Sequence, residues 1–417
     1  VPHLADTLVE GSESYGLALA WETFPPGMNL TVSPLPFTGT ILDINSATLA
    51  LTGAVTLDEA VGSTPLTVTL ALGGGTGTLA QPVSVPLNLV DGTAIYGGGS
   101  GDYALSGPAN STTVNFAAGA AHGSTQVVTV NIVNDARVEG TESFSAGLGA
   151  VSGPATLSGA AVTLTISDND TASIAFQAAT STAPEGTTPH TVNALLAISA
   201  NGTGTPELAV AVAVPVNATP GSATTPADYT LSTSSINFPV AAVAGLTRVI
   251  SIAIVNDLLS EPGEDFSLGF GTVTGPATAS GTHLVTIADN DVAGVTVTQS
   301  AGTTAVTEGG ASDSYTVVLT SQPSADVSIN LDFDPAQVIL NGDSDGALSL
   351  SFTPASWDTV RTVSVLAVDD TVIESNPHSS VIVQTLSSAD PVYAAINPAD
   401  VTVSITCLLY TSPSPRD

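Results

Sequence analysis

The sequence predicts an all-β chain in which β-sandwiches of roughly 120 residues follow one another end to end. Three observations support this prediction. Short acidic motifs recur, and the Asp that leads them appears at intervals of 129, 122 and 113 residues. Apolar and polar residues alternate with a period of two, as in Val128, Val130 and Ile132, which is typical of half-buried strands. Clusters of Gly, Pro, Ser and Thr separate these segments, and no helical periodicity is present.

The motifs divide the chain into repeats. An acidic segment at 134–144 has a close copy at 256–266 and relatives at 5–15 and 369–374. An Ile-x-Asp-Asn-Asp motif ends at Asp170 and recurs with its end at Asp291. We therefore expect five parts: 1–45, the C-terminal half of a repeat; 46–170, repeat 1; 171–291, repeat 2; 292–406, repeat 3, a variant truncated at its end; and 407–417, a tail.

The tail does not continue the repeat pattern. After their last predicted strand, repeats 1 and 2 have Asp-Asn-Asp. Repeat 3 is followed instead by Cys-Leu-Leu-Tyr-Thr-Ser-Pro-Ser-Pro-Arg-Asp at 407–417. Those eleven residues resemble a one-frame translation of a common transposase sequencing adapter. We interpret them as an artefactual tail, and a divergent natural tail is the alternative. Cys407, the only cysteine, is in neither case interpreted as a nucleophile.

The composition excludes several classes of protein. The chain of 417 residues has 37 acidic residues but only 4 Arg and no Lys, for a formal net charge of −33. A nucleic-acid-binding protein needs a basic face to neutralise phosphates, and binding to anionic lipid headgroups needs one too, so we expect neither. One cysteine forms no internal disulfide. No stretch is apolar enough to predict a membrane span.

Most acids occupy the recurring motifs. Repeats 1 and 2 contain nine acids each, and all lie at the motifs except Asp58, Asp91, Glu207 and Asp265. The motifs follow predicted strand ends, and alternate turns of a sandwich meet at the same pole. Converging carboxylates repel one another, and the few Arg residues cannot neutralise them, so a bound cation is expected. All-oxygen ligation suits Ca²⁺, whereas Mg²⁺ prefers fewer carboxylates and retained water.

Other interpretations of the polar residues were weighed. Asp and Asn stabilise turns through local hydrogen bonds, and this is the favoured interpretation for Asn134, Asn169, Asn256 and Asn290. Paired carboxylates also occur in glycosidases, but here the same set recurs in each repeat without a cleft-forming insertion. The histidines occupy no matching positions and are expected in turns or at the surface. No Ser/His/Asp arrangement or phosphate-binding loop is evident, so the sequence does not predict an enzyme.

The combined motif Asn-Asp-x-x-x-Glu-x-x-Glu-x-Phe, followed by Ile-x-Asp-Asn-Asp, resembles the Calx-beta domain. An early Glu and an Asp-Tyr pair upstream fit the same family, and the resemblance covers nearly all of residues 1–406. It implies an Ig-like seven-stranded sandwich with calcium at one pole. The family includes regulatory domains of sodium/calcium exchangers, cytoplasmic repeats of an integrin subunit and many bacterial surface proteins.

The resemblance also implies the calcium ligands, position by position. In repeats 1 and 2 these are Glu59, Asp102, Asp135, Glu139, Glu142, Asp168 and Asp170, and Glu185, Asp228, Asp257, Glu261, Glu264, Asp289 and Asp291. Repeat 3 departs from the pattern, since Pro377 occupies the second Glu position and the terminal acids are lost to the tail. Its weaker candidates are Glu308, Asp369, Asp370 and Glu374.

These expectations together describe a calcium-binding tandem-repeat module of a large surface or secreted protein, with Ca²⁺ stiffening the repeat poles and joints for adhesion or display. The resemblance implies an extracellular or cell-surface location in a bacterium. A protein or glycan at a cell surface is the expected partner, besides the calcium ions. Two alternatives stay open: a calcium-sensing regulatory domain coupled to a membrane protein, and a metal-free spacer attached to an enzyme outside the fragment.

Overall fold

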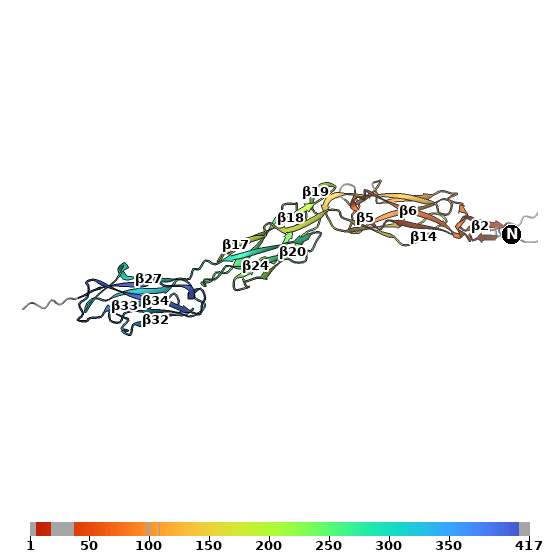
Figure 1. Cartoon of the computed structure of the whole chain (residues 1–417). Helices are drawn as coiled ribbons and strands as arrows, with labels where there is room; N and C mark the ends of the chain where they lie inside the picture. Colours follow the sequence, from red (N-terminus) through yellow and green to blue (C-terminus); the bar gives the residue numbers. More distant parts are fainter. Residues whose placement is uncertain (1–5, 18–36, 98–100, 108, 408–417) are drawn as a thin grey trace, which may run out of the picture.

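The structure is a computed structural model that describes residues 6–17, 37–97, 101–107 and 109–407. In this part of the chain the regular elements are β-strands and four short 3₁₀ turns, which confirms the predicted all-β class. None of the described segments forms a helix that is long and apolar enough to cross a membrane. Figure 1 shows three β-sandwiches arranged in a row, as the repeats predict.

The first sandwich packs two five-stranded sheets against each other, with strand orders β10-β8-β13-β15-β5 and β14-β4-β6-β11-β9. Seven of its strands have six or more residues, and three short ones have three residues each. Its strands are β4 (Ala47–Gly53), β5 (Thr56–Asp58), β6 (Ser63–Leu72), β8 (Val83–Asp91), β9 (Tyr103–Leu105), β10 (Ser111–Phe116), β11 (Thr125–Ile132), β13 (Glu142–Leu148), β14 (Thr156–Ser158) and β15 (Val162–Ser167).

The second sandwich repeats this arrangement with strand orders β21-β23-β18-β16-β25 and β17-β26-β24-β20-β22. The equivalent strands pair in the same way, so β17 runs parallel to β26 as β5 does to β15. Its strands are β16 (Thr171–Phe176), β17 (Thr180–Pro184), β18 (His190–Ser199), β20 (Val212–Pro220), β21 (Tyr229–Leu231), β22 (Ser235–Phe238), β23 (Thr247–Ile254), β24 (Glu264–Phe270), β25 (Thr278–Ser280) and β26 (Thr282–Ala288).

The third sandwich has a four-stranded sheet, β27-β29-β33-β31, and a five-stranded sheet, β28-β35-β34-β30-β32. Its strands are β27 (Val295–Gln299), β28 (Thr304–Thr307), β29 (Asp313–Leu319), β30 (Val327–Asp332), β31 (Val338–Leu340), β32 (Ala347–Phe352), β33 (Arg361–Ala367), β34 (His378–Ser388) and β35 (Val401–Thr406).

The predicted period of two is visible in the cores. Along β6, side chains from Thr64 to Leu72 alternate between buried and less buried positions, because successive strand residues point to opposite faces of a sheet. Near the acidic pole of the first sandwich, Tyr103 stacks on Phe144 with ring centroids 3.8 Å apart. Tyr229 and Phe266 form the same stack in the second sandwich, also at 3.8 Å. Each sandwich has its own apolar core.

Short parallel strand pairs extend from the sandwiches to their neighbours. β12 (Asp135–Val138), from the first sandwich, pairs with β19 (Thr203–Leu208), from the second. β1 (Leu8–Val9), from the predicted half repeat, pairs in the same way with β7 (Thr78–Leu79) of the first sandwich. The half repeat also forms the hairpin of β2 (Glu13–Leu17) and β3 (Phe37–Ile41). Residues 1–5 and 18–36 of the half repeat, and positions 408–417 of the predicted tail, lie outside the described residues.

Candidate metal centres

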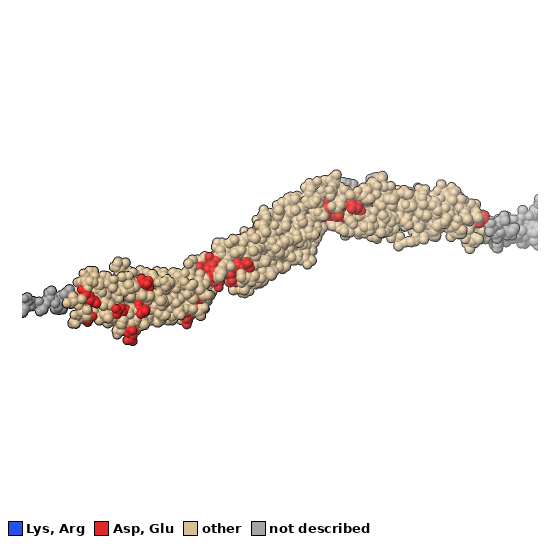
Figure 2. Space-filling view, viewed as in Figure 1, with Lys and Arg blue, Asp and Glu red and all other residues tan. Residues whose placement is uncertain are grey.

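The seven predicted ligands of the first sandwich all lie at its end nearest the second sandwich, where strands stop and turns begin. Figure 2 shows acidic side chains gathered at the joints between sandwiches, while the broad faces of the first two sandwiches on this side carry few. Glu59 opens a 3₁₀ turn after β5, and Asp102 precedes β9. Asp135 opens β12 and Glu139 follows it, Glu142 opens β13, and Asp168 and Asp170 follow β15.

Six of these acids form two compact groups. Carboxylate oxygens of Glu59, Asp168 and Asp170 lie within 4.8 Å of one another, and so do those of Asp102, Glu139 and Glu142. A cavity of about 10 Å³, roughly the room that one water molecule needs, is lined by residues of both groups. The seventh acid, Asp135, donates its backbone N–H to Glu59 Oε1 at 2.8 Å, so it lies beside the first group.

Backbone amides hold Asp168 at the centre of this pole. Its Oδ2 accepts the N–H groups of Glu139 at 2.8 Å and Gly140 at 2.9 Å, and its Oδ1 accepts that of Asp170 at 2.7 Å. The carboxylate therefore ties the turn after β12 to the turn after β15, as the turn-stabilising interpretation expects. A carboxylate has about four lone-pair sites, so these three bonds still leave capacity for a cation.

The electrostatics of the pole disfavour full ionisation without a cation. Burial, followed by the charges of neighbouring acids, raises the pKa of Glu139 to about 7 and that of Glu142 to about 8. Burial is also the main cause that raises the pKa of Glu59 to about 7. Arg137 offsets part of this charge, because its guanidinium lies 3.4 Å from Glu139. The remaining excess is the charge that a cation would neutralise.

The second sandwich repeats one of the two groups. Oxygens of Glu185, Asp289 and Asp291 lie within 4.8 Å of one another. Asp289 accepts the backbone N–H of Glu261 at 2.7 Å and that of Asp291 at 2.8 Å, as Asp168 does in the first sandwich. Pro262 occupies the place of Gly140 and has no N–H, so this carboxylate accepts one amide fewer.

The other acids of this pole are more widely spaced. Asp228, Glu261 and Glu264 correspond to the second group of the first sandwich, but within the described residues they do not reach the 4.8 Å spacing. Asp228 accepts the backbone N–H of Thr224 at 2.6 Å and its hydroxyl at 3.0 Å, and Asp102 accepts the backbone N–H of Ile95 at 2.6 Å in the first sandwich. Burial and then Asp228 raise the pKa of Glu264 to about 7. Asp257 accepts the backbone N–H of Leu259 at 2.8 Å, as a turn-stabilising residue does.

Unpartnered oxygens indicate that a cation fits both poles. Asp170 Oδ2, Glu185 Oε2 and Asp291 Oδ2 are buried and have no hydrogen-bond partner. Leaving a buried charged oxygen unpaired costs free energy, so such atoms are rare without a ligand. The donors at both poles are carboxylate oxygens, which are the ligands that Ca²⁺ prefers. Bound there, Ca²⁺ would neutralise the repulsion and fix the turns that carry its ligands.

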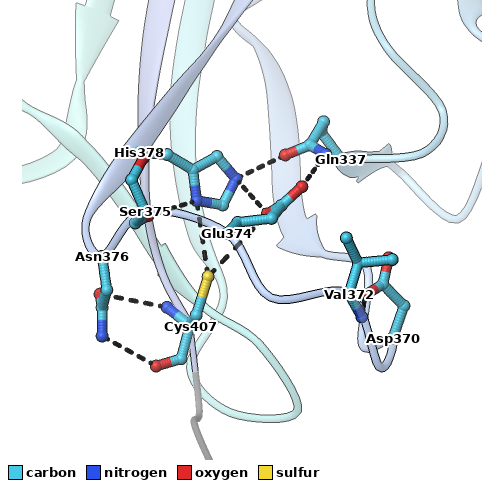
Figure 3. A network of polar contacts seen from close by, with 8 residues as sticks. All are labelled: Gln337, Asp370, Val372, Glu374, Ser375, Asn376, His378 and Cys407. Atoms are coloured by element: carbon cyan, nitrogen blue, oxygen red, sulfur yellow. Dashed lines mark hydrogen bonds and ion pairs between the residues drawn. The ribbon is translucent and has the colours of Figure 1, made fainter.

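The third sandwich has a different set of side chains at its pole. Figure 3 shows Glu374 between Gln337, which donates to it at 2.7 Å, and His378, whose Nε2 lies 2.9 Å away. The thiol of Cys407 lies on the other side, 3.5 Å from His378 Nδ1. Burial and the neighbouring Glu308 and Glu374 raise the pKa of that thiol.

The register of β35 explains why the third pole differs. Cys407 follows β35 where Asp168 follows β15 and Asp289 follows β26, so the central carboxylate is missing. Of the weaker candidates, only Glu374 joins a group with metal-ligand spacing in the described chain, with His378 and Cys407. Glu308 is buried beside Cys407, and Asp369 lies against Gly309. Asp370 accepts the N–H of Val372 at 2.7 Å, away from this group in Figure 3.

Sequence reasoning missed two features. The residues that connect the first pole to the next sandwich, Asn201 and Glu207, lie outside the recurring motifs, and no local pattern distinguishes them. The expectation that all histidines lie in turns or at the surface was wrong for His283, which is only 2% exposed. It faces the core because it belongs to the buried set of β26, in step with Val285 and Ile287.

The fold and the carboxylate groups define a class: tandem β-sandwiches with oxygen-rich poles suited to a hard cation. The chain matches the Calx-beta domain at residues 52–170, 167–301 and 289–406, and it belongs to that family.

Solved structures that match parts of the chain include one titled "Crystal structure of CBD12 from CALX1.2", with 16% identity and a TM-score of 0.25, covering 57% of this chain and 99% of that chain. The apo form of the Calx CBD1 domain has 17% identity and a TM-score of 0.24, covering 29% of this chain and 99% of that one. Protocadherin gamma B7 cadherin domains 1–4 have 10% identity and a TM-score of 0.30, covering 89% and 80%. Among curated proteins, none matches the chain.

Proposed function

We propose that this chain is a calcium-binding tandem module of a large surface or secreted protein, and that Ca²⁺ at its first two poles stiffens the joints between sandwiches for adhesion or display. The observation that supports this proposal is that the ligand-bearing turns are also the joints. Binding at a pole would therefore act directly on the orientation of the next sandwich.

The joint between the first two sandwiches is built from the first metal pole. β12 begins at the predicted ligand Asp135 and pairs with β19, so that Asp135 lies opposite Thr203 and Val138 opposite Leu208. Val138 is 1% exposed and packs in the core of the second sandwich. Asp170 Oδ1 accepts the backbone N–H of Asn201 at 2.6 Å. Ordering the pole would thus order these contacts as well.

The preceding joint has the same construction. Asp43 accepts the backbone N–H groups of Glu10 at 2.7 Å, Gly11 at 3.2 Å and Asn45 at 2.8 Å, as Asp168 does with its own neighbours. The adjoining β1 pairs with β7 of the first sandwich. One design of joint therefore recurs along the chain, which suits a rod assembled from repeats.

The joint between the second and third sandwiches has fewer such contacts. The turn after Asp257 meets the third sandwich through the N–H of Gln322, which donates to the carbonyl of Leu258 at 2.7 Å. Leu259 and Gln322 also form an isolated parallel bridge. A joint held by few direct contacts would depend more on the metal for stiffness than one that includes a paired strand.

The setting that we propose is the outside of a bacterial cell, with a protein or glycan at a cell surface as the partner. Extracellular calcium is near millimolar, and modules of this kind bind it with dissociation constants of about 10⁻⁴–10⁻³ M. The pole chemistry supports cation binding, because its acids accept backbone amides, lie in groups of like charges or have a pKa that burial and neighbouring acids raise.

Small-angle X-ray scattering of the full chain tests the proposal. We expect Ca²⁺ to raise the maximum dimension and narrow the distribution of shapes relative to EDTA, and Mg²⁺ to have a weaker effect. The variant Glu185→Gln should lose the response at the second pole, while Asp345→Asn, the loss of one exposed acidic charge, should keep it. Identical scattering in millimolar Ca²⁺ and in EDTA would instead identify a metal-free spacer, and saturation at micromolar Ca²⁺ would favour a sensor.

A further inference from the structure

A partly buried polar network lies in the second sandwich, separate from the metal pole. Ser181 Oγ is 2.9 Å from His190 Nε2 and 2.8 Å from His283 Nε2. His283 Nδ1 lies 2.7 Å from the carbonyl oxygen of Ala178. These residues are not among the predicted ligands, and Ser181 is four residues from Glu185 in the sequence.

The partners determine where the protons are. The Ala178 carbonyl only accepts, so His283 Nδ1 carries a proton and donates it. In the neutral ring Nε2 then has a lone pair, which accepts from the Ser181 hydroxyl. With its own proton used, Ser181 Oγ accepts from His190 Nε2–H. With both rings neutral the network is a one-way chain of hydrogen bonds from His190 through Ser181 to His283, and at least one ring must stay neutral for the serine hydroxyl to keep an acceptor.

The network connects three strands of two sheets. Ser181 is in β17, the edge strand of its sheet, whose one strand neighbour there is β26, which carries His283. His190 begins β18 in the opposite sheet. The His283 ring also lies 5.7 Å from the ring of Phe176. Side-chain hydrogen bonds therefore add to the backbone ladder that holds β17 in place.

We propose that Ser181, His190 and His283 form an acid-sensitive latch that holds β17 against both sheets at neutral pH and releases it in mild acid. Once both rings are protonated, both Nε2 atoms are donors facing Ser181 Oγ, so the serine hydroxyl loses its acceptor. Two charged rings would then face each other across one oxygen, in a site where His283 is 2% exposed. Both effects disfavour the closed arrangement.

The surroundings support this assignment. Burial, and then His283, lower the pKa of His190. β16, β17 and β25 carry no titratable side chain. Arg248 of β23 lies over the Phe238 ring at 5.6 Å, and Glu264 and Asp265 of β24 lie at the metal pole. Among the described strands of this sandwich, none therefore places a carboxylate where it would stabilise a histidinium. A histidine with a lowered pKa in the folded state stabilises the fold above about pH 6.5 and loses that contribution as the pH falls.

The first sandwich provides an internal control. In the matching strand register, Val55 takes the place of Ser181, Thr64 that of His190, and Val162 that of His283. That sandwich therefore lacks the latch, although its acidic pole is built alike. If acid speeds hydrogen exchange of β17 but not of β5, the change is specific to the histidine network.

Hydrogen–deuterium exchange of the full chain in EDTA tests the proposal, at pH 7.5 and 5.5 and corrected for intrinsic exchange rates. EDTA removes any contribution of bound metal. We expect residues 177–187 to exchange roughly fivefold faster in acid, the change that one lost hydrogen bond produces. Residues 53–61, around β5, should show no such increase.

Two variants separate the latch from a purely structural role. The triple variant Ser181→Val, His190→Thr and His283→Val introduces the residues of the first sandwich and should abolish the acid response. Ser181→Ala should speed exchange of β17 at pH 7.5 and leave little further increase at pH 5.5. Equal protection of the wild-type segment at both pH values, or an acid response that survives in either variant, would overturn the proposal.

Discussion

Replacing Glu59 by Gln should stabilise the metal-free protein and destabilise the calcium-loaded one. Gln has nearly the same shape and keeps an oxygen for the Asp135 N–H, which Glu59 accepts at 2.8 Å. The substitution removes only the charge, which faces Asp168 and Asp170 in the metal-free pole. With Ca²⁺ bound, the same change would remove a ligand.

The size of the effect follows from the pKa of Glu59, which rises from 4.5 to about 7. One pKa unit corresponds to about 1.4 kcal/mol, so ionising Glu59 at pH 8 lowers the free energy of unfolding by about 2–3 kcal/mol. Glu59 is 6% exposed, so solvent screening reduces this only modestly. Because the folded pKa is raised, the penalty is present above pH 7 and disappears as the pH falls to 4.5. Glu59→Gln should therefore raise the free energy of unfolding of the metal-free protein at pH 8 and change it very little at pH 4.5.

Differential scanning calorimetry of the full chain measures this. In EDTA at pH 8, the transition of the first sandwich should rise by roughly 10 °C for a domain of this size. In millimolar Ca²⁺ the order should reverse, with the variant melting below the wild type. Asp345→Asn, which removes an exposed acidic charge from the third sandwich, should leave the melting temperature of the first sandwich unchanged both in EDTA and in Ca²⁺. A lower melting temperature of the variant in EDTA at pH 8 would refute the reasoning, since Glu59 would then act as a turn-stabilising residue.

Three further predictions concern the poles, the joint and the core. Calcium affinity should fall as the pH drops from 8 to 6, because protons compete for acids such as Glu142, whose pKa is raised to about 8; isothermal titration in buffers of different ionisation enthalpy should show proton release, and a flat profile would contradict this. Gly202→Ala should loosen the joint between the first two sandwiches, because Gly202 has φ +102° and a Cβ there would lie 2.2 Å from the carbonyl oxygen of Asp135. Scattering should then report a broader range of shapes even with Ca²⁺, and an unchanged profile would show that β12 and β19 do not set the joint. Phe266→Ala should destabilise the second sandwich by about 3–5 kcal/mol, since Phe266 is fully buried and stacked on Tyr229; chemical denaturation should show a loss well above 1 kcal/mol, the usual cost of a point substitution.

The pole residues could be predicted well because their signals are local. Asp168 and Asp170 follow an alternating strand at fixed spacing, and turn chemistry at such a place requires a short polar side chain. The grouping within the pole could not be predicted. Asp102 joins Glu139 and Glu142, whereas its counterpart Asp228 does not reach Glu261 and Glu264 at the 4.8 Å spacing, although each Asp accepts a backbone N–H from upstream in the chain.

The third pole shows the same limit. Its weaker acids were identified from spacing, but the contact of Glu374 with His378 and Cys407 depends on where the end of β35 places position 407. Where the third pole lacks the central carboxylate, Glu374 contacts Gln337 and His378 instead, because buried polar groups must find hydrogen bonds.

The sequence by itself determined the all-β class, the repeat of the sandwiches and the acids that lie at their poles. These follow from side-chain alternation and turn chemistry, which act between residues close in the chain. Only the tertiary structure decided that β12 pairs with β19 and that Ser181 meets His283, 102 residues away. Contacts between distant segments depend on how whole strands pack, and no local pattern records that geometry.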